Sequence, residues 1–338
     1  MGMEVYEDIE RCFESGWSDG LPVIPPYGSL VDEMLRACHW TGTELIGRIA
    51  KQHIDIRGEH LAAAAVMAGC KPEYGRFLRA LAEALVEPVL NISGAEVTTG
   101  GVSATVFASG PIVAELGFEH EANALGANNR VNATIGRFAQ LVRLFCGRGG
   151  GVLEAHGTLG HPGRLSFCIA EHPDKYWEPF HTQVGLPANV SAATVMCTES
   201  PNIVNNHYAE TGEQILLTIA DTISHFGTMN FYYRTGGYIV VIAPDHMELV
   251  ARSFSRNEAQ RFVYEHAQRQ TDDLIRIGRI ARDPPTEWNV QPGKLRSPMY
   301  SENQLRFIES GKEGGKFSAV IPRWVGNVKP VAKVVVAN

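Results

Sequence analysis

The side chains best suited to chemistry in this sequence are a thiol, two imidazoles and a carboxylate, on Cys70, His161, His207 and Glu171. Cys70 precedes Lys71, and a neighbouring ammonium group lowers the pKa of a thiol and makes its sulfur a nucleophile. A histidine titrates near neutral pH, so it serves as an acid, a base or a ligand. We therefore expect a Cys/His/Glu site with these four residues in catalytic roles.

Each of these residues also has a structural interpretation. A free cysteine is most often buried and inert, and Cys70 fits that description as well as it fits a nucleophile. His161 stands in the stiff turn Gly-His-Pro-Gly, residues 160–163, where its ring is well placed to bond to the main chain. Glu171 is equally consistent with a capping or salt-bridging role. The sequence leaves these alternatives open.

A second group of residues is expected to bind the substrate. Arg130 precedes a predicted helix that begins near Ala133, and the free N–H groups of a helix N-terminus attract anions. These features favour a polar, carboxylated substrate, although helix capping explains the asparagines of the group equally well. The expected substrate-binding residues are Trp17, Asp19, Asn128, Arg130, Asn132 and Glu199.

The expected residue types also bear on cofactors. Zinc and iron both accept a mixture of cysteine, histidine and carboxylate ligands, so a divalent metal is one cofactor that this site would hold. The sequence has no local spacing such as Cys-x-x-Cys or His-Glu-x-x-His to support it. The cofactor is therefore left open.

Four apolar, β-branched segments are expected to position these residues. They span 105–111, 165–173, 194–201 and 238–246, and each runs into a proline, which ends strand pairing. In α/β sheets, ligands bind beyond the carboxyl ends of the strands. We therefore predict an α/β fold, with a largely parallel or mixed sheet flanked by helices and the site at these strand ends.

The chain is predicted to form an α/β catalytic domain over 1–282 and an extended C-terminal arm over 283–338. The arm is rich in proline, glycine and charge, and we expect it to contact its own domain or a neighbouring subunit in a homo-oligomer. Segments 104–111 and 193–201 match closely. The match has two explanations, either two related α/β halves or the limited residue repertoire of buried strands.

Composition narrows the class of protein. The net charge of −7 and the lack of a basic run argue against nucleic acid or an anionic membrane as a partner. No apolar stretch reaches the length of a membrane span. The first residues do not resemble a signal peptide, and the six cysteines lack paired spacing. These features predict a cytoplasmic protein with reduced thiols.

Three stretches carry a family resemblance: Gly-Trp-Ser-Asp-Gly-Leu-Pro-Val-Ile-Pro-Pro (16–26), Val-Met-Ala-Gly-Cys-Lys-Pro-Glu-Tyr (66–74), and Gly-Thr-Leu-Gly-His-Pro-Gly (157–163) with Phe-Cys-Ile-Ala-Glu (167–171). Over residues 5–268 the chain resembles the larger component of the proteins named for a UGSC motif, selenocysteine or cysteine followed by Gly-Ser-Cys. This chain has no Cys-Gly-Ser-Cys. The resemblance implies that the motif lies on a small thiol partner protein or that this member lacks it.

Three functions follow as hypotheses. The first is a small-molecule enzyme of the lyase or hydrolase type, acting through the Cys/His/Glu site. The second is a redox enzyme that works with a separate thiol partner protein. The third is a non-catalytic binding or scaffold subunit.

Overall fold

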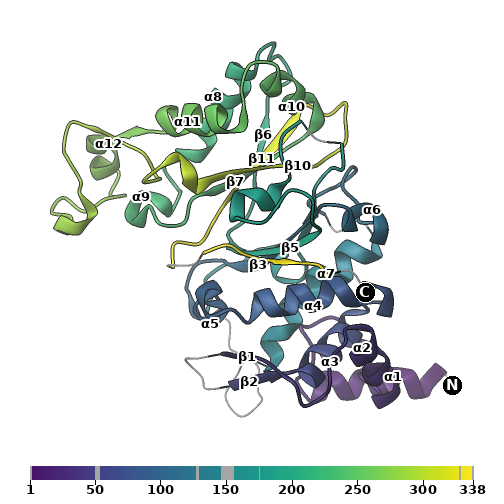
Figure 1. The fold of residues 1–338 in the computed structure, drawn as a ribbon. Coiled ribbons are helices and arrows are strands. Elements are labelled where there is room, and N and C mark those ends of the chain that lie inside the picture. The colour runs from purple at the N-terminus through teal and green to yellow at the C-terminus, as the bar shows by residue number, and fades with distance from the viewer. Residues whose placement is uncertain are drawn as a thin grey trace. The chain divides into compact units, whose positions relative to one another are not determined.

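The chain folds into two compact units, each containing a four-stranded sheet (Figure 1). The structure is a computed structural model that describes residues 2–49, 54–126, 129–145, 156–174, 176–326 and 329–336. Unit 1 comprises Met1–Pro173, His181–Cys197 and Lys329–Asn338, and unit 2 comprises Asp174–Phe180 and Thr198–Val328. This division differs from the expected boundary after residue 282.

The sheet of unit 1 has the strand order β12-β5-β3-β4. β3 (Ser103–Ser109) and β4 (Cys168–Ala170) are parallel, whereas β12 (Val331–Val334) pairs antiparallel with β5 (Ala192–Thr198). Every residue of β3 and β5 is buried, as expected for apolar runs covered on both faces. The mixed α/β architecture predicted from the sequence is confirmed.

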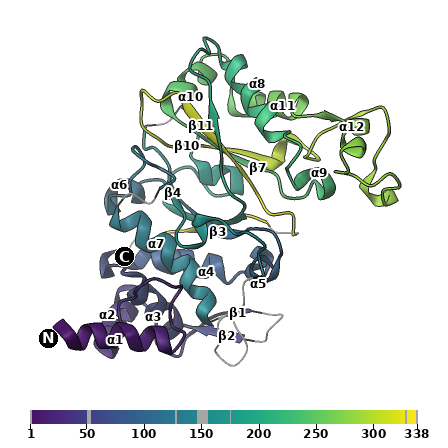
Figure 2. The same cartoon turned by 180° about the vertical axis from the view of Figure 1, so that it is seen from behind.

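Helices pack against this sheet and against one another. α7 lies on β3 and β4, α4 lies on β12, and α3 contacts both α2 and α7 (Figure 2). A small antiparallel pair, β1 and β2, adjoins the helices. The bounds are α1 Gly2–Glu14, α2 Gly28–Ala37, β1 Leu45–Ile49, β2 Ile54–Arg57, α3 Gly58–Ala68, α4 Gly75–Leu85, α5 Ile92–Val97, α6 Ile112–Leu116 and α7 Arg130–Leu141.

Two packed helices are separated by a short break near residue 70. α3 ends at Gly69, whose φ of 87° lies in the left-handed region that glycine tolerates. Pro72 then opens a 3₁₀ turn, Pro72–Tyr74, at a position where its missing N–H leaves no hydrogen bond unmade. Cys70 therefore lies in a short connection between two packed helices.

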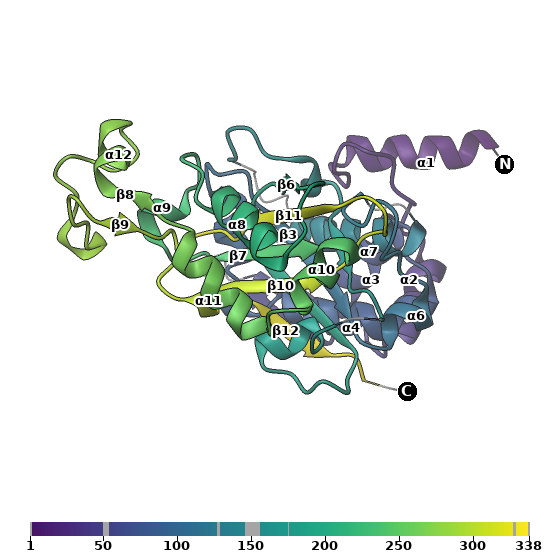
Figure 3. The same ribbon diagram turned by 90° about the horizontal axis from the view of Figure 1, so that it is seen from above.

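The sheet of unit 2 has the strand order β10-β7-β11-β6. β7 (Tyr238–Ile242) is parallel to β10 (Leu305–Glu309), and β11 (Phe317–Pro322) is antiparallel to both β7 and β6 (Asn202–Asn205). α8 (Gly212–Ile223), α10 (Pro244–Ala251) and α11 (Arg256–His266) pack together over this sheet (Figure 3). Their apolar residues and those of β7 form one core cluster.

The remaining elements of unit 2 are short. They are α9 (Asn230–Tyr233), β8 (Arg269–Gln270), α12 (Thr271–Arg276) and β9 (Leu295–Arg296), with β8 and β9 paired antiparallel. Across the described part of the chain, no helix combines the length and the apolar character needed to cross a bilayer.

Segment 283–338 contributes strands to both sheets, which differs from the extended arm expected there. β10 and β11 flank β7 in unit 2, and β12 forms the edge of the unit 1 sheet. The sequence interpretation missed β10 and β11 because each is short and bounded by glycine, proline and charge. The matching segments 104–111 and 193–201 form β3 and β5, which are neighbours in a single sheet, so they do not mark two separate halves.

Two helix-starting glycines provide a test of this packing. A Cβ on Gly75 would overlap the main-chain carbonyl of Ala37, whereas a Cβ on Gly28 would meet nothing within 4 Å. We expect Gly75→Ala to lower the free energy of unfolding by about 1–3 kcal/mol. Gly28→Ala should be neutral or stabilising by up to about 1 kcal/mol. Urea denaturation of both variants measures this, and equal stability of the two would contradict the packing described.

Candidate functional site

A buried amide in unit 1 fastens a loop to the sheet. Asn132, in the first turn of α7, is 1% exposed. Its Oδ1 accepts the N–H of Glu119 at 2.9 Å, and its Nδ2 donates to the carbonyl of Glu119 at 2.9 Å and to that of Cys168 at 3.3 Å. Since Cys168 begins β4, one side chain connects the loop at 117–121 to that strand.

Further contacts hold the same loop. The Nδ2 of Asn129 donates to the carbonyl of Gly117 at 2.8 Å, and its Oδ1 accepts the N–H of Asn132, which caps α7. The Phe118 ring packs on Phe77 with centroids 5.1 Å apart. The Glu119 carboxylate accepts the N–H of Glu121 at 2.8 Å. The residues that follow Phe118 are therefore positioned from both sides.

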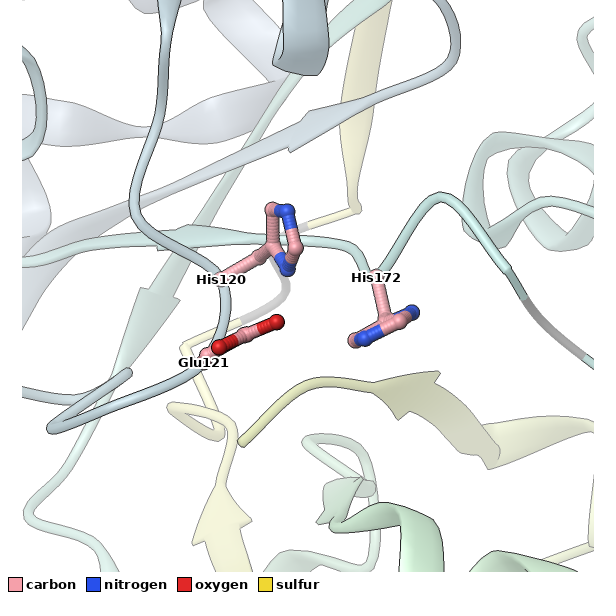
Figure 4. Close-up of side chains that lie close together, drawn as sticks. All are labelled: His120, Glu121 and His172. Atoms are coloured by element: carbon pink, nitrogen blue, oxygen red, sulfur yellow. The ribbon is translucent and has the colours of Figure 1, made fainter. Parts of the chain in front are cut away.

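This loop brings His120 and Glu121 close to His172, which follows the end of β4 (Figure 4). One potential ligand atom from each residue lies within 4.8 Å of the other two. The two imidazole rings meet edge to face with centroids 4.7 Å apart. Both histidines are half-buried and Glu121 is exposed, so the carboxylate has freedom to adjust.

Two histidines and one carboxylate form a common ligand set for a catalytic divalent metal. Two ligand atoms about 2.1 Å from one ion lie about 3.4 Å apart in a tetrahedral site. Bringing the present atoms to that spacing requires side-chain movements of about 1 Å, and the exposed Glu121 side chain has room for them. We refer to His120, Glu121 and His172 as the His–Glu–His cluster.

The cluster lies at the sheet edge where the sequence predicted chemistry. β3 and β4 are parallel, and the N–H of Glu171 donates to the carbonyl of Ala108 at 2.9 Å. The carboxyl ends of the two strands therefore meet, with Ser109 on one and Glu171 and His172 on the other. Glu171 is buried directly before the cluster. The fourth expected strand end, after β7, belongs to unit 2.

Ser109 forms a Ser–His pair within unit 1. Its Oγ is 2.8 Å from Nδ1 of His181, whose Nε2 lies 2.9 Å from the carbonyl of Pro187. Because a carbonyl only accepts, Nε2 carries the proton and Nδ1 accepts from the Ser109 hydroxyl. Both side chains are fully buried, so this pair stabilises the interior rather than meeting a substrate.

Cys70 does not have the environment of a nucleophile. Its side chain is buried, its Sγ donates to the carbonyl of Thr134 at 3.4 Å, and burial raises the pKa of the thiol to about 12. The hydrogen bond to Thr134 and the charge of Arg130 lower that pKa only in part. The thiol therefore stays protonated at neutral pH.

His161 bonds to the surrounding turn. Its Nδ1 accepts the N–H of Gly163 at 3.2 Å, and its Nε2 lies 3.1 Å from Oγ of Ser103. The ring also meets Phe167 edge-on. These contacts match the structural alternative for a turn histidine, since they orient the ring and occupy both nitrogens.

The expected substrate-binding residues of unit 1 are mostly engaged within the protein. Arg130 donates from Nε and Nη2 to the carbonyl of Gly69 at 3.1 and 3.0 Å. Asp19 accepts two hydrogen bonds from Arg137. Burial alone would raise the pKa of Asp19, but Arg137 holds it below its usual value. Trp17 is exposed, and Asn128 lies outside the described residues.

His207 and Glu199 belong to unit 2, whereas Cys70, His161 and Glu171 belong to unit 1. His207 is exposed, lies edge-on to Phe317 and has Nε2 3.0 Å from the carbonyl of Gly315. The four residues expected to be catalytic are thus divided between two compact units. Sequence reasoning missed His120 and Glu121, although the repeated Glu-His pairs 119–120 and 171–172 were an available signal.

Comparison with family models gives no match for this chain, and comparison with curated proteins gives none either. The resemblance to the UGSC-motif proteins therefore stays a prediction.

The protonated state of Cys70 leads to a test by alkylation. A pKa of about 12, against about 8.5 for an exposed cysteine, lowers the thiolate fraction more than about a thousandfold. We expect iodoacetamide at pH 8 to leave Cys70 unmodified in the native protein and to alkylate it after unfolding in guanidinium. Mass spectrometry of the Cys70 peptide measures both rates, and similar rates would show that the thiol is reactive.

Glu199 leads to a prediction about stability and pH. Burial raises the pKa of its carboxyl to about 7, partly opposed by Arg279. The folded protein therefore binds more protons than the unfolded chain between about pH 4.5 and pH 7, so stability falls as pH rises through that window. At pH 8, Glu199→Gln should be more stable than the native protein by on the order of 1–3 kcal/mol.

Denaturation of Glu199→Gln at pH 5 and pH 8 checks this expectation. Glu210→Gln, a change at an exposed residue of the same unit, is the control and should keep the native pH dependence. A Glu199→Gln protein whose stability falls with pH as steeply as that of the native protein would exclude the assignment.

Proposed function

We propose that this protein is a metal-dependent small-molecule enzyme of the lyase or hydrolase type, acting on a polar, carboxylated substrate. The observation that supports this proposal is the His–Glu–His cluster, which lies where the carboxyl ends of the paired strands β3 and β4 are adjacent. In this proposal His120, Glu121 and His172 replace Cys70 and His161 as the central residues.

The chemistry of the ligand set favours catalysis over a purely structural metal. Structural zinc sites are closed by four protein ligands, whereas three protein ligands leave a position for water or substrate. A divalent ion there would polarise a substrate oxygen and lower the pKa of bound water. A substrate carboxylate would bind directly to the open position, which is why a carboxylated substrate remains part of the proposal.

Thiol redox chemistry has less support. The five described cysteines, Cys12, Cys38, Cys70, Cys168 and Cys197, are all buried. Burial raises the pKa of the thiols of Cys38, Cys70 and Cys168. Exchange with a partner thiol needs an accessible thiolate, and these side chains do not offer one.

Metal binding is the first test. After treatment with EDTA, the protein should bind about one Zn²⁺ or Co²⁺ per chain, with a visible Co²⁺ spectrum that reports nitrogen and oxygen ligands. His172→Ala should weaken binding more than about a hundredfold, because loss of even an outer-shell partner costs about 10- to 100-fold. His266→Gln, at an exposed histidine of unit 2, is the matched control and should bind normally. Equal affinity in the two variants would refute the assignment.

Variants of Glu119 test how far the geometry of the loop contributes to metal binding, because Glu119 positions the loop and is not itself in the His–Glu–His cluster. Glu119→Ala removes the acceptor for the Glu121 N–H and should weaken metal binding by about tenfold. Glu119→Gln keeps an acceptor oxygen and should restore most of the affinity.

Catalysis is tested with hydrolysis of nitrophenyl esters and dehydration of small hydroxy acids, the second followed by absorbance of the unsaturated product. Turnover should disappear with EDTA, return with the metal, and be absent in His172→Ala but present in His266→Gln. Tight metal binding without any turnover in such panels would favour the non-catalytic alternative.

A further inference from the structure

Unit 2 contains a polar pocket separate from the His–Glu–His cluster. It has a volume of about 230 Å³ and is lined by side chains from the end of α9, the end of α11, the start of α12 and the segment around β9. Three of these side chains are cationic, Arg234, Lys294 and Arg296, and among the described residues that line the pocket none is Asp or Glu. Its lining is therefore positively charged.

Arg296 contributes a buried charge to the lining of this pocket. It is 5% exposed, and its guanidinium donates to the main-chain carbonyls of Phe231, Trp288, Asn289 and Tyr232 at 3.0–3.4 Å. These carbonyls satisfy the N–H groups but carry no negative charge. Within the described residues, no carboxylate forms an ion pair with Arg296. A buried cation without a counter-charge is costly.

Arg234 adds a second charge nearby. Its Nε and Nη2 donate to the carbonyl of Met299, and its guanidinium lies 4.4 Å from the centre of the Tyr300 ring. Its Nη1 has no protein hydrogen-bond partner in the described part of the chain. Burial, together with the charge of Arg234, lowers the pKa of Arg296 to about 10. The two guanidinium groups therefore repel each other, and none of the described residues that line the pocket is an Asp or Glu that would offset their charge.

Lys294 and two side-chain amides of the same segment also line the pocket. Lys294 is exposed, and its main chain is fixed because its carbonyl accepts from the N–H and Oγ1 of Thr271 at 2.9 and 2.6 Å. Asn289 and Gln291 are exposed on the same segment. The pocket thus offers ammonium, guanidinium and amide donors from a segment that is held in place.

We propose that this pocket binds a small anionic ligand carrying a phosphate or carboxylate group. An anion there places negative charge between Arg234, Lys294 and the buried Arg296, and it accepts hydrogen bonds from the exposed donors. Charge-assisted bonds of this kind are stronger than neutral ones. The volume is below the roughly 300–1,000 Å³ typical of drug-sized ligands, which fits a phosphate monoester or a short dicarboxylate.

Calorimetric titration of the full-length protein tests the proposal with defined probes. Inorganic phosphate, glycerol 3-phosphate and succinate are compared with glycerol, which has no charge. We expect at least one anion to bind at millimolar concentration or below and glycerol not to bind. The relative affinities for glycerol 3-phosphate and succinate distinguish a phosphate ligand from a carboxylate ligand. If none of the three anions binds, the proposal is refuted.

Variants locate the bound anion. Lys294→Gln should weaken binding about tenfold or more, because it removes a charged donor. Lys312→Gln is the matched control, since Lys312 is an exposed cation of the same unit that does not line the pocket. Gln291→Glu is a second variant, for use if Lys294→Gln fails to fold. It adds a negative charge at the pocket and should also weaken anion binding. Unchanged affinity in a folded pocket variant would place the anion elsewhere and refute the proposal.

Discussion

The hydrogen bonds of the Asn132 side chain are the interaction on which the candidate metal centre depends. The loop at 117–121 has little regular structure of its own, and this single buried amide fixes both the N–H and the carbonyl of Glu119 while bonding to β4 at Cys168. A buried amide with satisfied partners is stable in only one orientation. The position of His120 and Glu121 relative to His172 follows from that constraint.

The contacts around Cys70 argue against thiol chemistry in unit 1. Arg130, at the start of α7, is bonded to the carbonyl of Gly69, next to the buried Cys70. The arginine is thereby used to hold the α3–α4 connection against α7. Arg130 and Asp19 look functional by residue type, but their hydrogen bonds to Gly69 and Arg137 stabilise the fold.

The sequence predicted the elements with strong local signals. The α3–α4 break follows from Gly69 and Pro72, and the buried strands β3, β5 and β7 follow from continuous β-branched runs. It did not predict that β10 and β11 pair with β7 on either side, because pairing between distant segments leaves no mark in local composition.

The candidate site was predictable only in part. The edge of the sheet after β4 was expected, since parallel strands present their carboxyl ends together. His120 and Glu121 were missed because their meeting with His172 is set by the long-range contacts of Asn132, a residue expected to bind substrate. Its actual contacts are with the main chain of Glu119 and Cys168, which neither periodicity nor capping rules reveal.

The measurement that tests the central claim most directly is anomalous X-ray diffraction at the zinc edge, from crystals of the zinc-loaded protein. The account predicts a zinc peak about 2.0–2.2 Å from one nitrogen each of His120 and His172 and from a carboxylate oxygen of Glu121. A zinc peak bound by other residues, or no ordered zinc in the protein, would contradict it.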